Sequence, residues 1–481
     1  MKRLLVLLAV LLLPACSAAA KTHAVSPGEL TLALSQAVDG DVIELSEGVY
    51  GEAEETFPLT VTHAVTIRAA QDARPVIDAP AFQSAFRVEA DGVTLQGVDI
   101  AMRRTGIYAL GDGLTLIDVS ISLADEAWRT SSCGLWMGGV RHATLENCAF
   151  WDCSVAMAGP PLSETSHLVP VLTGMFEVGE EPEYFTTHSI TGCTVNGGPL
   201  FYAANLESVS APADAGQVIV AGCGRVTVEG ADVSNGSMGM QIIYCDDVQV
   251  LRCKADDCGV FGIYLAKLGG GAVRESGGEG TNHAIDIRAS QNIIVADCYA
   301  NACDQGIFLS GVQCGLVQDC VVTDTGQGYF LAAGAHCQID RCVAENCENG
   351  MNIQKEHDVL ITRCTLTGNT ICAARLDGSP TVFVDNTLRD NWVGVMAYGN
   401  VSFVLADNVI CGSGSCGVYM RDIAYSRLSG NTICASAKAS LQAVGEMASS
   451  LLTGNRLDRM YELTGGAVLR DENNLIGAKD E

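Results

Sequence analysis

The chain has 481 residues, with 52 Gly, 12 Pro and a formal net charge of −28. This length suits one very large domain or several ordinary ones. The charge argues against a nucleic-acid partner, because Lys and Arg dominate phosphate binding. It also argues against an acidic glycan that docks without a cation or a local basic patch.

The first residues predict an export signal that ends in a lipid anchor. Lys2 and Arg3 precede an apolar run at 4–13 that is too short to span a bilayer. The tetrapeptide Leu-Pro-Ala-Cys, ending at Cys16, looks like a bacterial lipobox, which implies cleavage before Cys16 and lipidation there. An ordinary secretory cleavage nearby is the alternative. We expect an exported protein, anchored to a membrane by lipid, in the periplasm or at the cell surface.

The next segment predicts a cap for a sheet edge. The stretch PGELTLALSQAVDGDVIEL (27–45) has the pattern of an amphipathic helix that leads into a strand. A helix in this place protects a β edge that would otherwise be open.

Most of the remaining chain is an internal repeat. Three consecutive steps, from Cys298 to Cys364, are each 22 residues long. The same register continues through Asn386 and Asn408. Each aligned residue follows an alternating segment such as VQVLRC or LITRC, and a Gly-led strand such as GIFL or GVYM comes eight or nine residues later. A unit of three short strands and turns follows from this pattern.

Such a unit buries its apolar face only when copies stack. The sequence therefore predicts an all-β parallel β-helix, a single-stranded solenoid of ~22-residue coils with an N-terminal capping helix. We expect a signal peptide at 1–15, a lipid-anchored linker at 16–25 and a β-helix domain at 26–475. Excursions from the coils are expected at 159–188, 199–216 and 266–288.

The exported part resembles right-handed parallel β-helix proteins of the pectin-lyase-like kind. The resemblance rests on the opening LSQAVDGDVIELSEGVY and on the coils after it. A second resemblance covers 188–243, where TVNG-x-P, PADAGQV and VTVE occur as in NosD-type, or periplasmic copper-binding, β-helix proteins. This resemblance implies help in maturing a copper enzyme. The pectin-lyase-like group includes lyases, hydrolases, epimerases and non-enzymes, and fold alone does not choose among them.

The cysteines fall mostly in two inward columns of the repeat. Cys253 and Cys298 begin one column, and Cys258 and Cys303 lie five residues further on in the other. Stacked side chains ~4.8 Å apart are poorly placed for a disulfide, so we expect mainly free structural thiols. Some disulfides across turns and, less plausibly, metal thiolate remain open.

Four outward residues are expected to share one surface patch: Lys254, Asp232, Asp256 and Tyr299. A Lys beside carboxylates and a Tyr could abstract the proton next to a uronate carboxyl group. The carboxylates could alternatively hold Ca²⁺ and so bridge to an acidic sugar. A plain charged face is the third interpretation.

A second outward stripe follows the Gly-led strands. Its candidate ligand-binding aromatics are Trp136, Tyr264, Phe308, Phe330 and Tyr419. Exposed aromatic rows suit stacking on sugar rings or cover by a partner. Cross-coil packing that stiffens the sheet is the alternative.

Histidines near one corner could attract copper, because imidazole suits that metal. They form the pairs His142 with His188 and His336 with His357. Solvated turn histidines are the alternative, and no metal site is assigned.

Together these patterns predict a membrane-anchored β-helix protein that binds, and in one version processes, a polysaccharide. A uronate lyase or epimerase built on the Lys254 patch is one alternative. An accessory protein of copper-enzyme maturation is the other, and it is implied by resemblance alone. The sequence leaves the oligomeric state open.

Overall fold

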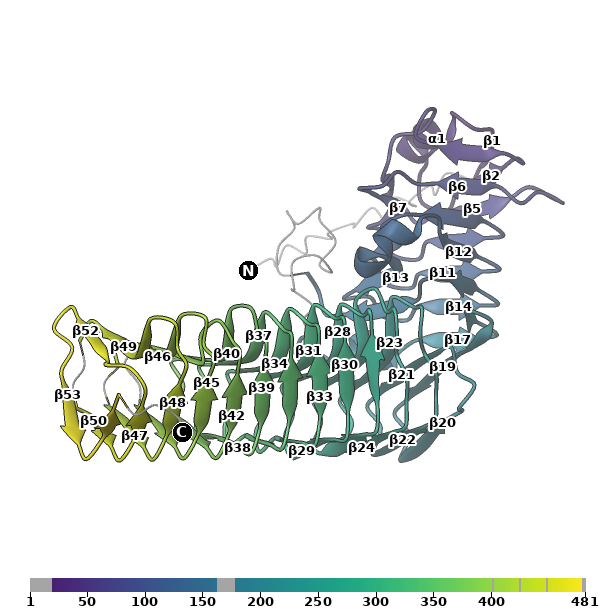
Figure 1. Ribbon diagram of the computed structural model, residues 1–481. Coiled ribbons are helices and arrows are strands. Elements are labelled where there is room, and N and C mark those ends of the chain that lie inside the picture. Colours follow the sequence, from purple (N-terminus) through teal and green to yellow (C-terminus); the bar gives the residue numbers. More distant parts are fainter. Residues whose placement is uncertain (1–19, 162–177, 400–401, 424, 447–448, 478–481) are drawn as a thin grey trace, which may run out of the picture.

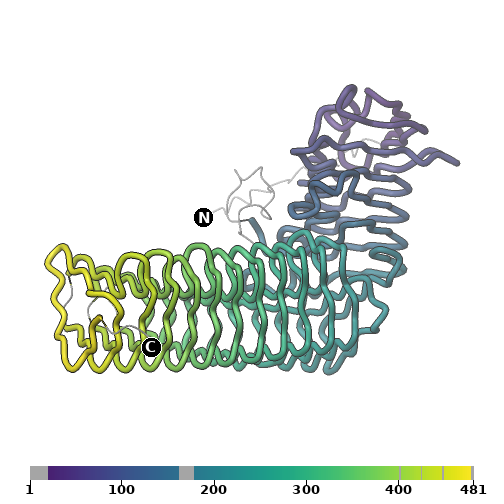
Figure 2. Tube along the Cα trace, in the orientation of Figure 1, coloured from purple at the N-terminus to yellow at the C-terminus, as the bar shows by residue number. Residues whose placement is uncertain are grey.

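The computed structural model describes residues 20–161, 178–399, 402–423, 425–446 and 449–477. It is an L-shaped molecule of stacked coils (Figures 1 and 2). The predicted parallel β-helix is confirmed, because strands pair in parallel with the equivalent strands of neighbouring coils. The predicted signal peptide and Cys16 lie outside the described residues. No described helix is long and apolar enough to cross a membrane.

The N-terminal arm, which ends at β18, contains three parallel sheets. Sheet A consists of β1 (Thr22–Val25), β2 (Val42–Leu45), β5 (Thr66–Ala69), β8 (Thr94–Gln96), β11 (Thr115–Ile117), β14 (Thr144–Glu146) and β17 (Ser189–Thr191). Sheet B consists of β3 (Val49–Gly51), β6 (Val76–Asp78), β9 (Asp99–Met102), β12 (Ser120–Leu123), β15 (Ala149–Trp151) and β18 (Thr194–Val195). Sheet C consists of β4 (Leu59–Val61), β7 (Ser84–Val88), β10 (Thr105–Ala109), β13 (Cys133–Gly138) and β16 (Val155–Ala158).

The C-terminal arm begins at β19 and also has three parallel sheets. Sheet D consists of β19 (Gly198–Ala204), β21 (Gln217–Ala221), β23 (Met238–Ile243), β25 (Phe261–Ala266), β28 (His283–Arg288), β31 (Gln305–Ser310), β34 (Gln327–Ala332), β37 (Asn349–Gln354), β40 (Cys372–Asp377), β43 (Val395–Tyr398), β46 (Cys416–Arg421), β49 (Ala439–Val444) and β52 (Glu462–Thr464). Sheet E consists of β20 (Ser208–Ala211), β22 (Arg225–Glu229), β24 (Asp247–Leu251), β26 (Gly271–Arg274), β29 (Ile293–Ala296), β32 (Leu316–Gln318), β35 (Gln338–Asp340), β38 (Val359–Thr362), β41 (Thr381–Val384), β44 (Ser402–Ala406), β47 (Tyr425–Ser429), β50 (Ser449–Thr453) and β53 (Leu469–Glu472). Sheet F consists of β27 (Gly277–Glu279), β30 (Tyr299–Asn301), β33 (Val321–Thr323), β36 (Val343–Glu345), β39 (Thr365–Thr367), β42 (Thr387–Arg389), β45 (Val409–Cys411), β48 (Thr432–Cys434), β51 (Arg456–Leu457) and β54 (Leu475–Ile476).

The predicted capping helix is confirmed as α1 (Leu30–Gln36), which is followed by β2. Buried Glu55 caps it, because its Oε1 accepts hydrogen bonds from Gly28 N (2.8 Å) and Leu30 N (3.1 Å). This carboxylate satisfies amide groups that the first turn of a helix leaves unpaired. Two further short helices are described, η1 (Glu126–Ser131) and α2 (Glu183–Thr186).

Three predicted ranges are wrong. The linker was expected to extend to residue 25, but β1 already pairs with β2 from Thr22 onward. The excursion expected at 266–288 is a regular coil made of β26, β27 and β28, each paired with strands of the coils before or after it. The excursion expected at 199–216 likewise supplies β19 and β20. Glycine-rich segments concealed these coils, since LGGG and SGGEG weaken the alternating pattern.

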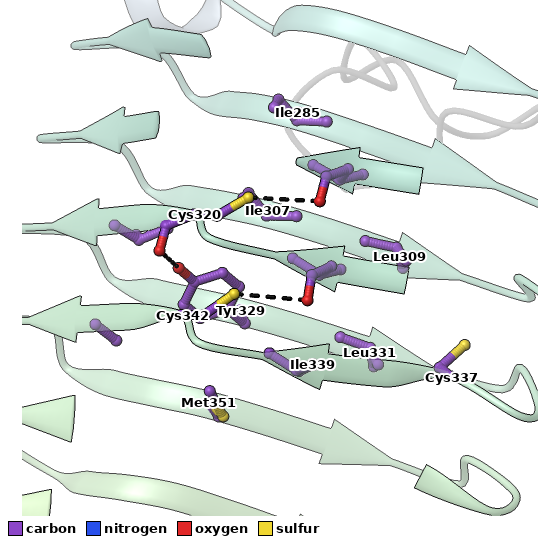
Figure 3. Close-up of a cluster of buried hydrophobic side chains, with 14 of the residues drawn as sticks. Ile285, Ile307, Leu309, Cys320, Tyr329, Leu331, Cys337, Ile339, Cys342 and Met351 are labelled. Atoms are coloured by element: carbon purple, nitrogen blue, oxygen red, sulfur yellow. Dashed lines mark hydrogen bonds between the residues drawn. The ribbon is translucent and has the colours of Figure 1, made fainter. Parts of the chain in front are cut away.

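The interior follows the alternation of each strand. In β31 the side chains of Ile307 and Leu309 are fully buried, whereas Phe308 between them points outward. Figure 3 shows Ile307 and Leu309 beside Tyr329, whose Oη donates to the carbonyl oxygens of Cys320 (2.8 Å) and Val343 (2.9 Å). Even the large interior residue is therefore satisfied by backbone groups of the turns.

The aligned Cys and Asn residues form one inward column at the turn between sheets E and F. Cys342 Sγ donates to carbonyl groups of two coils, including Val317 O at 3.6 Å, while Cys364 Sγ accepts from Cys342 N. Asn408 repeats this arrangement, because Nδ2 donates to Phe383 O (2.9 Å) and Oδ1 accepts from Asn386 N (2.9 Å). Cys and Asn interchange here because both donate to a carbonyl group and accept from a backbone amide.

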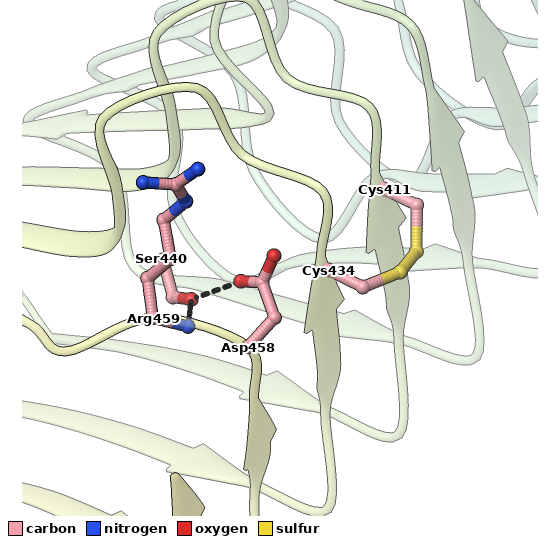
Figure 4. The surroundings of a disulfide bond; sticks show 5 residues. All are labelled: Cys411, Cys434, Ser440, Asp458 and Arg459. Atoms are coloured by element: carbon pink, nitrogen blue, oxygen red, sulfur yellow. Dashed lines mark hydrogen bonds between the residues drawn. A yellow bond between two sulfur atoms is a disulfide. The ribbon is translucent and has the colours of Figure 1, made fainter. Parts of the chain in front are cut away.

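The described cysteines are mainly free and buried, as predicted, but one stacked pair is joined. Cys411 in β45 and Cys434 in β48 are register partners and form a disulfide, with a Cα–Cα separation of 4.6 Å (Figure 4). The expectation that stacked cysteines stay apart is wrong for this pair. These side chains are not part of the inward column, whose thiols are held by hydrogen bonds to carbonyl groups.

The elbow of the L begins at an Asn-Gly turn. Asn196 and Gly197 both have positive φ, 50° and 83°, and they reverse the chain so that β18 and β19 pair in antiparallel fashion. Asn-Gly is the preferred pair for such a tight hairpin turn. The stacking direction of the coils changes at this point (Figure 1).

Two buried glutamines close the edge strand of the N-terminal arm at the elbow. Gln217 Oε1 accepts from Val155 N (3.2 Å), and its Nε2 donates to Val155 O (2.5 Å). Gln241 bonds Met157 in the same way, through Oε1 (3.1 Å) and Nε2 (2.6 Å). The two amides take the place of a further strand beside β16, so an edge that would otherwise be open is covered.

Removing one member of the Asn column tests its role. Asn408→Ala leaves the amide of Asn386 and the carbonyl of Phe383 without their partner inside the protein, so we expect unfolding free energy to fall by about 2–3 kcal/mol. Asn408→Cys should cost less than half as much, because a thiol occupies the same column at Cys364. Urea unfolding measures the unfolding free energy of both variants. Equal losses of free energy in the two variants would mean that the column stabilises the fold by packing alone.

Candidate functional site

The residues of the predicted Lys254 patch lie on the C-terminal arm. Lys254 Nζ lies 2.6 Å from Asp256 Oδ2, and the Lys254 side chain is about half exposed. Asp232 Oδ1 accepts from Ser234 Oγ at 2.5 Å. Asp256 Oδ1 accepts from the backbone amide of Glu279 at 3.0 Å. Both carboxylates therefore already serve the turns of the scaffold.

The sequence analysis placed Tyr299 on the coil directly after that of Lys254. In the structure one further coil lies between them. Asp232 pairs with Lys254, Lys254 pairs with Gly277, and Gly277 pairs with Tyr299. A Cβ at Gly277 would lie 2.9 Å from Cδ1 of Tyr299, so the glycine leaves room for this ring. The missing coil is the segment that the sequence analysis assigned to an excursion.

The electrostatics of the patch do not favour a lysine base. The hydrogen bond and the charge of Asp256, followed by the charges of Asp232 and Tyr299, raise the pKa of Lys254 above its ordinary value. A general base must be unprotonated when it acts. Lys254 is held as a cation between carboxylates, an arrangement that suits an exposed ion pair.

The predicted aromatic stripe is divided between two sheets. Trp136 lies in sheet C beside Tyr108, while Tyr264 lies in sheet D. Both are buried, at 1% and 0% exposure, because the arms pack together at the elbow. The expectation that Trp136 and Tyr264 offer exposed rings to a ligand is therefore wrong.

The other three predicted aromatics keep part of their rings at the surface. Phe308 and Phe330 stack in parallel, with ring centroids 4.7 Å apart and an interplanar angle of 7°. Tyr419 lies further along the same outward register and contacts the ring of Tyr398 at 5.8 Å. All three are half-buried. Sheet D thus presents an aromatic face beyond the elbow.

A buried ion pair lies at the elbow end of this face. Asp286 is fully buried, and Arg288 binds it through two atoms, Nε to Oδ1 at 2.8 Å and Nη2 to Oδ2 at 2.9 Å. His283 Nδ1 lies 2.9 Å from Asp286 Oδ2. Burial opposes ionisation of Asp286, but the charges and hydrogen bonds of Arg288 and His283 prevail, so its pKa is lowered.

Polar groups continue the face past the phenylalanines. Asn352 Nδ2 donates to Gln327 Oε1 at 2.9 Å, and Gln354 Nε2 donates to Asn352 Oδ1 at 3.2 Å. Arg375 then lies over the ring of Tyr398, 5.4 Å from its centroid. We call the outward surface from Phe308 to Tyr419 the sheet D face. It alternates rings with amide and guanidinium groups.

Sequence reasoning missed the polar half of this face. Asp286 and Arg288 fell in the presumed excursion, and Tyr398 belongs to a second outward column two residues beyond the first. The available signal was the length of each Gly-led strand, since a six-residue strand has more than one outward position.

The histidine pairs are placed as turn residues. His188 is buried, with Nδ1 accepting from Ala143 N (3.2 Å) and Nε2 2.9 Å from Tyr184 O. Burial lowers its pKa, so it remains neutral near pH 7. His336 and His357 are exposed on adjacent coils, where His336 N donates to His357 O. Both residues belong to turns.

The described residues offer no cluster of metal ligands. Within the residues described, no three His, Cys, Asp or Glu side chains come together so as to hold a metal ion. Ca²⁺ and copper therefore have no assigned ligands in this part of the chain. The inward thiols are bonded to carbonyl oxygens in the core, as Cys320 Sγ is to Gln318 O at 3.1 Å.

A polar groove lies separately on the N-terminal arm. It has a volume of 680 Å³ and is lined by residues that include Arg68, Arg74 and Asp118. Arg68 pairs with Glu44 at 3.4 Å, and Arg74 Nη1 donates to Asp118 O at 2.8 Å. Its guanidinium groups are already engaged within the protein.

Comparison with sequence families gives one match. Residues 183–373 and 319–476 match the family described as periplasmic copper-binding protein (NosD). These ranges cover most of the C-terminal arm, including the sheet D face. No curated protein matches the chain.

Solved structures of similar fold have low identity to this chain. The periplasmic alginate epimerase AlgG is 12% identical, covers 90% of this chain and 85% of its own, and has a TM-score of 0.25. The Azotobacter vinelandii mannuronan C-5 epimerase AlgE4 A-module is 12% identical, with coverages of 95% and 100% and a TM-score of 0.24. Pectate lyase Pel9A is 11% identical, with coverages of 80% and 76% and a TM-score of 0.22. These similarities are too low to carry an activity over to this chain.

One buried carboxyl group is unusual. Glu356 is fully buried, and neither carboxylate oxygen has a hydrogen-bond partner among the described residues. Both oxygens lie where a side chain on Gly334 would begin, about 3 Å from its Cβ position. Burial raises the pKa of Glu356 to about 7.

This raised pKa predicts a stability change with pH. The folded state holds the Glu356 proton more tightly than the unfolded chain, so its stabilising contribution is complete below pH 4.5 and is lost as pH rises through about 7. Glu356→Gln should match the wild type at pH 4 and exceed it at pH 8 by at most about 3 kcal/mol. Urea unfolding across this range is the measurement, with exposed Glu348→Gln as control, and parallel curves would contradict the prediction.

Proposed function

The chain belongs to the NosD family of periplasmic copper-binding proteins, and we propose that it is an exported β-helix protein that binds a polysaccharide along the sheet D face. The observation that supports this most directly is the parallel pair of half-buried rings, Phe308 and Phe330. The stack covers one face of each ring, so the apolar ring edges that remain at the surface are the contact offered to sugar rings. Consecutive coils repeat the contact at the spacing of parallel strands, ~4.8 Å.

The neighbouring polar groups suit hydroxyl recognition. Half-buried Gln327 and Gln354 are linked through buried Asn352 by amide hydrogen bonds beside the rings. Amides both donate and accept, so they can bond sugar hydroxyl groups of either orientation. Arg375 supplies further donors at the far end of the face. The proposed ligand is an extended chain that lies across several coils.

The charge of the molecule points to a neutral polysaccharide. The formal net charge of −28 repels an acidic chain, and sheet D holds its arginines close to carboxylates, as Arg375 is to Asp377 at 3.3 Å. An acidic glycan would need a cation to screen this repulsion. We therefore expect neutral chains to bind without added Ca²⁺.

The two phenylalanines provide the test. A glycan array of purified wild-type protein identifies a binding chain, and titration calorimetry then compares variants. Phe308→Ala combined with Phe330→Ala should weaken binding at least about tenfold, because both stacking surfaces are lost. Tyr425→Ala is the matched control, since this 59% exposed tyrosine lies on sheet E and should leave the affinity unchanged.

The result has clear alternatives. Equal affinity of the double variant and the wild type would place the ligand elsewhere, with the polar groove near Arg68 as the next surface to mutate. Failure of every neutral and acidic glycan to bind would overturn the proposal. Far-UV circular dichroism and thermal unfolding of each variant separate loss of binding from loss of fold.

Family membership supports a second candidate, an accessory role in maturing a copper enzyme. The described residues offer no group of ligands for the metal, so this role would rest on contact with a protein partner. Genes beside the coding sequence separate the two candidates. Reductase and transporter genes favour the accessory role, while polysaccharide-handling genes favour the sheet D proposal.

A further inference from the structure

A polar crevice lies at the elbow, between the two arms. It has a volume of 350 Å³ and is lined by Thr130 of the N-terminal arm and by Gly280, Thr281, Asn282, Ala302 and Asp304 of the C-terminal arm. We call it the elbow crevice. The residues of the C-terminal arm belong to the turns that lead from sheet F to sheet D on two adjacent coils. These turns are in register, because Gln305 N donates to Asn282 O at 2.8 Å.

The wall from the N-terminal arm is η1, which packs closely on the C-terminal arm. A Cβ at Gly259 would lie 2.2 Å from Arg129 O, so the glycine lets η1 approach this turn. Gly259 occupies the position of Thr281 one coil earlier, so η1 closes the crevice on that side. The guanidinium group of Arg129 is itself engaged, because its Nη2 donates to Asp152 Oδ1 at 3.1 Å.

Three polar side chains of the crevice keep their hydrogen-bonding capacity. Thr130, Asn282 and Asp304 make no side-chain hydrogen bond or ion pair within the described part of the chain. Thr130 and Asp304 are exposed, and Asn282 is half-buried. Buried Thr281 between them is fixed, because its Oγ1 donates to Ala255 O at 2.8 Å. Hydroxyl, amide and carboxylate groups around one crevice suit a ligand that is rich in hydroxyl groups.

Gln305 adds an acceptor beside the crevice. It follows Asp304 directly, and its Oε1 is buried without a hydrogen-bond partner among the described residues. One coil further on, the equivalent Gln327 Oε1 accepts from Asn352. The residue that would serve Gln305 in this way is Phe330, whose side chain has no donor. An unsatisfied buried acceptor costs free energy, so a hydroxyl group that reaches Gln305 is favoured.

The elbow crevice adjoins one end of the sheet D face. His283 follows Asn282 directly, and its ring lies against that of Phe308, with centroids 5.6 Å apart. Toward the elbow, the outward column continues from Phe308 to Asp286 and Tyr264, and both are fully buried. A chain that lies on the sheet D face therefore ends at Phe308 or turns there toward the crevice.

We propose that the elbow crevice binds the terminal sugar of a neutral polysaccharide whose following sugars lie on the sheet D face. This inference rests on the function proposed above and adds that the protein recognises a chain end. A terminal sugar has a free hydroxyl group where an internal sugar has a linkage, so it offers Asn282 and Asp304 a bond that an internal sugar lacks. The described residues that line the crevice include no Lys or Arg, so an acidic sugar finds no counter-charge there.

The experiment uses the full chain and three neutral probes, mannohexaose, xylohexaose and maltohexaose, each beside an unbranched polymer of the same linkage. Titration calorimetry measures the affinity, and analytical ultracentrifugation counts the protein molecules on each polymer chain. We expect one protein molecule on each chain whatever its length, because a chain has one end of each kind. Binding to internal sugars would instead place several molecules on a long polymer.

Variants then assign the crevice. Asn282→Ala combined with Asp304→Ala should weaken binding of the best probe at least about tenfold, because two hydrogen-bonding groups are lost. Thr130→Ala should weaken it about threefold, because the N-terminal arm contributes one group. Glu348→Ala is the matched control, since this exposed residue occupies the position of Asp304 two coils away and should leave the affinity unchanged.

The outcomes separate this inference from the proposed function. Several protein molecules on each polymer chain, or wild-type affinity in the crevice variants, would overturn end recognition. Weaker binding by the Phe308 and Phe330 double variant would still support the sheet D face in that case. If none of the three probes binds, the inference fails, and the wider glycan array still decides the proposed function. Thermal unfolding shows whether each variant keeps its fold.

Discussion

The parallel register between coils is the constraint from which every surface of this protein follows. Backbone hydrogen bonds fix each residue beside the one about 22 positions away, so chemistry is assembled from positions that are distant in sequence and equivalent in the coil. Phe308 stacks on Phe330 for this reason, and Asn282 and Asp304 line one crevice for the same reason. The inward column keeps that register, because Cys and Asn side chains pair with backbone groups of two neighbouring coils at each turn.

The elbow interrupts this parallel stacking, and it decides which part of the outer surface is available. Sheet D continues through the elbow, but there the side chains of Gln217, Gln241 and Tyr264 are buried against the N-terminal arm. Beyond β28 the same outward column reaches the surface, as half-buried Phe308 shows. A single stripe of equivalent positions is thus interface at one end and a candidate binding face at the other. The ion pair between buried Asp286 and Arg288 lies at the boundary between the interface and the candidate binding face.

Sequence periodicity was enough to predict the coils, the cap and the inward column, since these depend on short-range alternation and a constant spacing. It was not enough for the elbow, because the amides of Gln217 and Gln241 replace a strand by contacts 62 and 84 residues apart that follow no repeat. The Asn196-Gly197 pair was a readable hairpin signal within the segment that resembles NosD-type proteins. The coil at 267–288 was concealed by glycines, and its loss from the alignment misplaced Tyr299 relative to Lys254. Exposure of Trp136 could not be predicted, since it depends on how the arms pack.

Burial and exposure also divide the ionisable groups by chemistry. The inward thiols donate to carbonyl oxygens, and burial raises the pKa of several of them, such as Cys258 to about 12, so they act as structural hydrogen-bond donors. Burial raises the pKa of Glu356, whose oxygens have no well-aligned hydrogen-bond partner among the described residues, so the stability of the corner that carries His336 depends on pH. The pKa of Lys254, which lies between carboxylates, is also raised, but for an amine a raised pKa favours the charged form, so Lys254 stays a cation. A single variable, the direction in which each turn position points, therefore separates the residues that hold the fold from the residues that can react.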